Sequence, residues 1–166
     1  MKQFLLGIAM VFMLLIGATG FTNDNAEKSI GIGAKVPKVE IANSASSVTL
    51  GEETPQYLLV TFWRSDDARS RMTCNEYEHL VTSEKDVDAK VDFVAINMDE
   101  SETLFHEIVV IDNMNVNTQY RLDDEAGHIL NRAFNLDKGM GTVLIAPDGT
   151  VEAFNPSANY LRTLGV

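Results

Sequence analysis

The amino-acid sequence predicts an α/β fold in which helices cover both faces of a mixed central sheet. A continuous apolar run at residues 57–63 and a mainly apolar segment at 91–98, each followed by an amphipathic helical pattern, are typical of buried parallel strands. A strong turn signal, Pro147-Asp148-Gly149-Thr150, separates two further apolar runs and indicates an antiparallel hairpin. Alternating strands and helices give parallel crossovers, so the added hairpin makes the sheet mixed.

The length and composition favour one domain and exclude several classes of function. The chain has 166 residues, of which 45% are hydrophobic, enough for a genuine core. It carries 24 acidic and 13 basic residues, a net charge of −11, which argues against binding the phosphates of nucleic acid. Its single cysteine excludes an intrachain disulfide and a multi-cysteine zinc site.

Residues 1–20 are expected to form a signal peptide. Their apolar stretch, Phe4–Ile16, is too short to span a bilayer, and the small residues Gly17–Gly20 suit a signal-peptidase site. No cysteine lies at the junction, so a lipid anchor is not expected. We therefore expect a secreted protein of the periplasm or cell envelope, attached to the membrane only if the leader is retained. A polar linker at 21–32 would precede the domain, residues 33–166.

The first half of the domain is expected to be three strands and a helix. Two short β-rich segments, 39–41 and 48–50, precede the run at 57–63, which is apolar throughout and predicts a strand covered on both faces. Ser65-Asp66-Asp67 can cap the start of the helix that follows. Along that helix, apolar or small residues recur at helical spacing, at Ser70, Cys74, Tyr77 and Val81.

The second half continues the alternation of strands and helices. After the strand at 91–98, a helix begins near Ser101. Its expected apolar stripe consists of Leu104, Phe105, Ile108 and Ile111. The remaining elements are, in order, a short extended segment, a helix with an apolar stripe, the two hairpin strands and a short helix: 116–120, 125–134, 142–146, 151–154 and 158–164.

Three of these segments resemble parts of a known family. The strand Leu58–Trp63, with the polar loop and helix after it, resembles the central strand of thioredoxins, and Val143–Val151 looks like the family's penultimate hairpin. The entry Gly33–Pro37 is similar to that of exported thiol–disulfide oxidoreductases of the cytochrome-maturation type and of peroxiredoxins. The resemblance covers residues 33–160 and implies a thioredoxin-like three-layer sandwich.

The chemistry of that family is missing from the sequence. The family's Cys-x-x-Cys begins four residues after the tryptophan, at positions that hold Asp67 and Ser70 here. The family's buried acidic residue corresponds to Thr61, and its cis-proline corresponds to Gly141. Thiol–disulfide exchange needs an attacking thiolate and a resolving sulfur, so the ordinary dithiol mechanism is excluded. The pattern Asp67–Arg71 also resembles that of exported thioredoxin-like proteins of gut-type bacteria that lack the dithiol.

Cys74 is the one candidate reactive thiol, and two interpretations of it stay open. Its place on the apolar stripe favours a buried side chain that behaves as a small hydrophobe. The alternative is a reactive, peroxidatic thiol, whose pKa Arg69 and Arg71 would lower. Peroxiredoxins place proline and threonine at fixed distances before their cysteine, whereas here Thr73 is adjacent and no proline precedes it.

No metal site or cofactor is expected. Asp66 and Asp67 form a carboxylate pair for which helix capping is favoured over acid–base chemistry or metal binding. The histidines His79, His106 and His128 lie on three different predicted helices, without the paired spacing of metal ligands.

The expected function is therefore a redox-inactive binding or accessory module with an envelope protein or peptide as partner. The alternative is an oxidoreductase or peroxidase-like enzyme that uses Cys74. The candidate binding face surrounds the lost dithiol positions and includes the loop 139–142; its residues are Trp63, Arg64, Arg69, Arg71 and Thr142.

Overall fold

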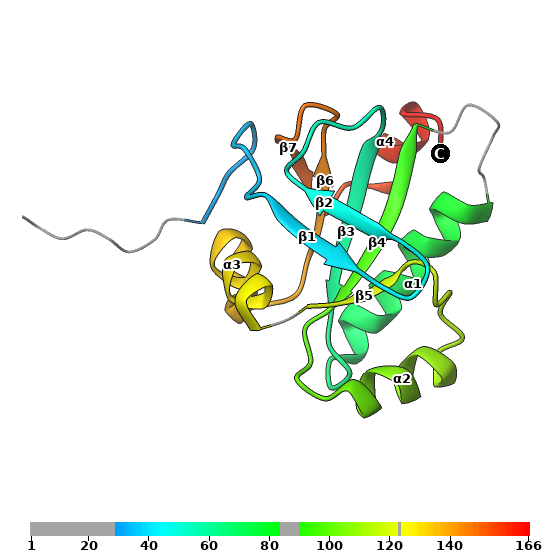
Figure 1. Cartoon of the computed structure of the whole chain (residues 1–166). Helices are drawn as coiled ribbons and strands as arrows, with labels where there is room; N and C mark the ends of the chain where they lie inside the picture. The colour runs from blue at the N-terminus through cyan, green and yellow to red at the C-terminus, as the bar shows by residue number, and fades with distance from the viewer. Residues whose placement is uncertain (1–28, 84–89, 123) are drawn as a thin grey trace, which may run out of the picture.

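A computed structural model describes residues 29–83, 90–122 and 124–166, so the predicted leader and most of the predicted linker lie outside the described residues. Within these ranges one sheet of seven strands is accompanied by four α helices and a short 3-10 helix, η1 (Figure 1). The elements are, in order, β1 (Val39–Ala42), β2 (Ser47–Leu50), β3 (Tyr57–Trp63), α1 (Ala68–Ser83), β4 (Val91–Asn97), α2 (Glu102–Ile111), β5 (Gln119–Arg121), α3 (Asp124–Phe134), η1 (Leu136–Lys138), β6 (Thr142–Ile145), β7 (Val151–Phe154) and α4 (Ala158–Thr163).

The sheet is mixed, as the sequence predicted. Its strand order is β2-β1-β5-β4-β3-β6-β7, and β4 pairs in parallel with both β3 and β5. The pairs β3–β6, β6–β7, β1–β2 and β1–β5 are antiparallel. The central strand β3 is therefore flanked by β4 and β6, and its carboxyl end leads directly to the start of α1.

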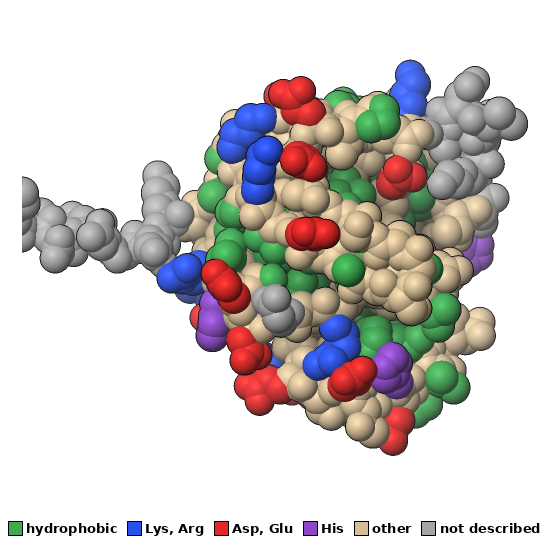
Figure 2. Space-filling model, viewed as in Figure 1, with side chains coloured by type: hydrophobic (Ala, Val, Ile, Leu, Met, Phe, Trp, Pro, Cys, Tyr) green, Lys and Arg blue, Asp and Glu red, His purple; other side chains and the backbone are tan. Residues whose placement is uncertain are grey.

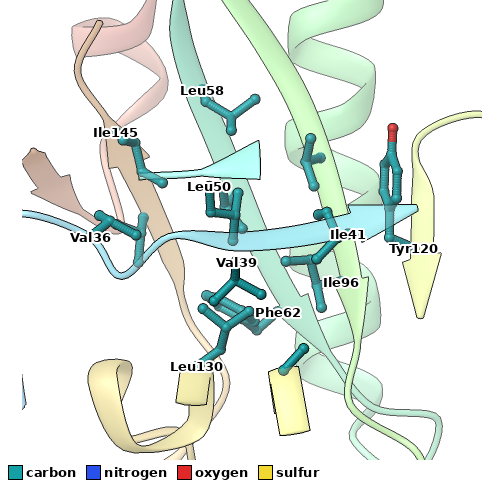
Figure 3. Close-up of a cluster of buried hydrophobic side chains, with 14 of the residues drawn as sticks. Val36, Val39, Ile41, Leu50, Leu58, Phe62, Ile96, Tyr120, Leu130 and Ile145 are labelled. Carbon is teal, nitrogen blue, oxygen red and sulfur yellow. The ribbon is translucent and has the colours of Figure 1, made fainter. Parts of the chain in front are cut away.

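The apolar run of β3 is buried on both faces of the sheet. Leu58 and Phe62 point into one core together with Leu130 of α3 (Figure 3). Leu59 and Trp63 point to the opposite core, which contains residues of α1, α2 and α4. This two-sided burial confirms the three-layer arrangement and explains why the run lacks the alternation of a half-exposed strand.

The apolar stripe of α2 differs from the predicted one. Phe105 and Ile108 are buried as expected, but the third buried residue is Val109. Leu104 is 39% exposed and Ile111 is 70% exposed, and hydrophobic side chains reach the surface over α2 (Figure 2). The buried residues of α2 have the spacing i, i+3 and i+4, beginning at Phe105 and ending at Val109. This spacing leaves Leu104 and Ile111 at the sides of the buried face.

The described part of the predicted linker is held against the domain. The N–H of Ile30 donates to the carbonyl of Ala133 at 2.9 Å, and the N–H of Gly33 donates to the carbonyl of Val151 at 2.7 Å. The side chain of Ile30 also packs against the core beside α3. Within the described residues, contacts with the domain therefore include Ile30, which precedes the predicted domain boundary. Among the helices in the described ranges, none combines the length and apolar character needed to cross a bilayer.

Candidate functional site

The two lost dithiol positions lie at the start of α1, where both side chains stabilise the helix end. The carboxylate Oδ1 of Asp67 accepts from the backbone N–H groups of Arg69 at 3.0 Å and Ser70 at 3.2 Å. The hydroxyl of Ser70 donates to the carbonyl of Asp67 at 2.9 Å and accepts from the N–H of Arg64 at 3.2 Å. Asp67 is thus a capping residue, as the sequence favoured, and the turn is closed by polar contacts.

Substituting Asp67 with alanine is expected to lower the free energy of unfolding by about 1 kcal/mol, because two N–H groups at the start of α1 lose their acceptor. Asp67→Asn keeps a capping oxygen and is expected to retain most of that stability. Urea unfolding of the two variants checks this. Equal losses for the alanine and asparagine variants would contradict the capping role.

Two threonines occupy the interior beneath this end of α1. Thr61, at the position of the family's acidic residue, is 1% exposed, and its hydroxyl lies 3.0 Å from that of Thr142. The side chain of Asn155 accepts from the N–H of Thr142 at 2.9 Å, and the N–H of Asn155 donates to the Thr142 carbonyl at 2.7 Å. Thr142 is therefore fully buried, and its predicted place on the binding face is corrected.

Trp63 is also buried and does not lie on the predicted face. Its exposed fraction is 0%, its ring packs against Phe105 at 5.9 Å between centroids, and its Nε1–H donates to Oε1 of Gln119 at 3.0 Å. Helix α2 and strand β5 supply these two contacts. The residue belongs to the core beneath α1.

Arg71 is held in a structural ion pair. Its Nε and one terminal nitrogen donate to the two carboxylate oxygens of Asp112 at 2.6 and 2.5 Å, and another terminal nitrogen donates to the carbonyl of Ser65. Hydrogen bonding to Asp112 raises the pKa of Arg71 above its ordinary value. Because this bidentate pair joins α1 to the end of α2, Arg71 is removed from the predicted binding face.

Arg64 remains exposed but has acidic partners. Its Nε lies 3.4 Å from Oδ1 of Asp66 and 3.9 Å from Oδ1 of Asp99. Asp99 is itself held by the backbone N–H of Ser65 at 2.9 Å. Arg64 and Asp99 border a cavity on the α3 side of the fold.

A groove of about 790 Å³ opens beside the lost dithiol positions. One wall is α1, and the other combines the end of η1, the loop before β6 and the segment before α4. Arg69 is exposed on the first wall, and Gly141, at the cis-proline position, lies on the second. A Cβ at Gly141 would make ordinary contact with the side chain of Asn155, at 3.5 Å, so a methyl group would fit there without a clash. The lining residues are Thr61, Phe62, Asp67, Arg69, Ser70, Thr73, Glu76, Tyr77, Leu80, Lys138, Gly139, Met140, Gly141, Asn155, Pro156, Ser157 and Ala158.

Several groove residues were not identified from the sequence. Thr73, Glu76 and Leu80 follow Arg69 at four, seven and eleven positions, a helical spacing that places them on one face of α1. That spacing was the signal available in the sequence. Lys138 and the segment 155–158 carry no such signal, because tertiary structure alone brings them opposite α1.

Cys74 is buried on the inner face of α1, as its position on the apolar stripe favoured. Its exposed fraction is 0%, and burial, with a further contribution from the charge of Glu78, raises the pKa of the thiol from 9.0 to about 12. A reactive cysteine needs an accessible, stabilised thiolate. This environment provides neither, so it does not support the peroxidase-like alternative.

Among the residues that the structure describes, no group of three or more histidine, cysteine or acidic side chains is arranged to hold a metal ion. His106 lies 3.6 Å from the carboxylate of Glu102, one turn earlier on α2, and both side chains are largely exposed. This pair is an ordinary surface contact of the i, i+4 kind.

Solved structures define the class of fold. A thioredoxin-like protein from Parabacteroides distasonis superposes with a TM-score of 0.62 and 27% identity, over 81% of this chain and 94% of that one. The thioredoxin domain of a thiol-disulfide oxidoreductase from Bacteroides vulgatus gives a TM-score of 0.68 and 18% identity, over 81% and 95%. A thiol:disulfide interchange protein from Bacteroides sp. gives 0.67 and 18%, over 82% and 88%.

The chain therefore has a thioredoxin-like fold that is structurally close to bacterial thiol–disulfide oxidoreductases. Its single cysteine, which is buried, argues against the dithiol chemistry of such enzymes. No protein-family model matches the sequence, and a search of curated proteins finds no similar chain.

Proposed function

We propose that this protein is a redox-inactive binding or accessory module of the bacterial cell envelope, which holds an extended segment of an envelope protein or peptide. The observation that carries the proposal is the groove beside Asp67, Ser70 and Gly141. An open groove remains at the place of the redox centre, while none of its lining residues carries a thiol. Such a surface can bind a chain without reacting with it.

Localisation in the envelope rests on the predicted leader. The apolar stretch and the small residues after it support export and cleavage after Gly20. N-terminal sequencing of the protein recovered from the envelope fraction is expected to begin at Phe21. Recovery from the cytoplasm with Met1 retained would overturn the localisation.

A photocrosslinking experiment tests the groove. A photoreactive amino acid is placed at Thr73, which lines the groove, and at Lys90, which is exposed outside it as a matched control. Ultraviolet irradiation of envelope extract is expected to give discrete adducts from position 73 and not from position 90. The same adducts from both positions, or none from position 73, would overturn the proposed binding face.

A further inference from the structure

We infer that the bound segment carries an acidic and a basic side chain three residues apart, the acidic one beside Arg69 and Lys138 and the basic one beside Glu76. The inference rests on the proposed function, because it names the chemistry of the partner in the same groove. Charge complementarity along the groove carries it.

Two available cations line the groove beside the lost dithiol positions. Arg69 projects from α1 and Lys138 from η1, so the charges come from different walls. Both residues are exposed, and within the described ranges neither side chain has a hydrogen bond or ion pair. By contrast, the neighbouring Arg64 and Arg71 are paired with carboxylates. The chain has 24 acidic residues, yet none of those described pairs with Arg69 or Lys138. These two cations therefore favour binding of an acidic side chain of the partner.

The nearby carboxylate of Asp67 does not cancel this preference. Its Oδ1 already accepts from two backbone N–H groups at the start of α1. The amino end of a helix carries a partial positive charge that compensates a capping carboxylate. Arg69 and Lys138 therefore remain the charges that a bound side chain meets at this end.

The second charged position lies two turns further along α1. Glu76 comes seven residues after Arg69, which corresponds to about 10.5 Å along a helix. It is exposed and has no ion-pair partner within the described residues. Burial raises the pKa of the Tyr77 hydroxyl, and the negative charge of Glu76 raises it further. The Tyr77 hydroxyl donates to the carbonyl of Pro156 at 2.7 Å and links the two walls there.

The separation of positions 69 and 76 along the helix axis sets the spacing expected in the partner. A polyproline II chain has three residues per turn and rises about 3.1 Å per residue, so side chains three residues apart lie on one side, about 9.3 Å from each other. A β-strand places same-side residues about 6.6 or about 13.2 Å apart. The separation along α1 therefore fits a spacing of three in an extended, polyproline-like segment.

Fluorescence anisotropy with synthetic decapeptides tests this inference. Four labelled peptides share a proline- and alanine-rich background and differ at two positions, as Glu-x-x-Lys, Lys-x-x-Glu, Glu-x-x-Glu and Lys-x-x-Lys. One of the two mixed-charge peptides is expected to bind at least tenfold more tightly than either like-charged peptide. Equal binding of the four peptides, or no binding at millimolar concentration, would overturn the inference.

Charge-reversal variants supply the matched controls. Arg69→Glu combined with Lys138→Glu is expected to weaken binding of the preferred peptide at least tenfold, whereas Lys90→Glu leaves it within twofold. Adding Glu76→Lys is expected to reverse the preference to the opposite order of charges. Unchanged binding by the double variant would overturn the inference. Crosslinks at position 73 together with no charge preference would leave the proposed function standing, whereas absence of those crosslinks would remove both.

Discussion

Replacing Trp63 with alanine is expected to lower the free energy of unfolding by about 3–5 kcal/mol. The side chain is fully buried at the end of β3, against Phe105, and its removal leaves a large cavity under α1. It also leaves Oε1 of Gln119 without its indole donor. Urea unfolding followed by circular dichroism measures the loss.

Trp63→Phe separates packing from hydrogen bonding. Phenylalanine fills most of the cavity but has no N–H for Gln119, so an intermediate loss is expected. A loss below about 1 kcal/mol for the alanine variant would contradict the buried position. A small loss of stability together with weaker partner binding by Trp63→Ala would show that Trp63 belongs to the binding face, as the sequence predicted.

The second large effect concerns the reactivity of Cys74. With its pKa raised to about 12, the thiol at pH 8 has a thiolate fraction about a thousandfold smaller than a thiol with pKa 9.0. Labelling by a disulfide reagent is therefore expected to be at least about a thousandfold slower in the native protein than in denaturant. Stoichiometric labelling of the native protein within seconds would contradict the burial of Cys74.

The same pKa shift predicts a dependence of stability on pH. Because folding raises the pKa of Cys74 from 9.0 to about 12, the folded state holds this proton more tightly than the unfolded state. The contribution is fully present below pH 9 and is lost as the pH rises from 9 towards 12. Wild type is expected to lose stability over this range relative to Cys74→Ala, as measured by urea unfolding at each pH. Parallel pH profiles would contradict the shift.

Much of the fold follows from local patterns in the sequence. The run 57–63 lacks polar alternation because both of its faces are covered, and this alone identifies a central strand. The turn Pro147–Thr150 fixes the hairpin, since Gly149 adopts a φ of +78° that glycine accepts readily. The capping role of Asp67 is predictable because a carboxylate just before a helix can accept hydrogen bonds from the free N–H groups of the first turn.

The site was predicted less well because its residues depend on distant parts of the chain. A two-sided apolar run does not reveal that Phe105 and Gln119 cover Trp63. Arg71 pairs with Asp112, 41 residues away, so its exposure could not be judged from its neighbours. The groove needs two walls, and helical spacing describes only the α1 wall.

A disulfide-reduction assay tests whether the thioredoxin-like scaffold acts without thiol–disulfide chemistry. Purified protein is incubated with a model peptide disulfide and dithiothreitol, beside the matched variant Cys74→Ser. Both proteins are expected to leave the reaction at its uncatalysed rate. Acceleration by wild type that disappears in Cys74→Ser would contradict a redox-inactive function and establish Cys74 as a reactive thiol.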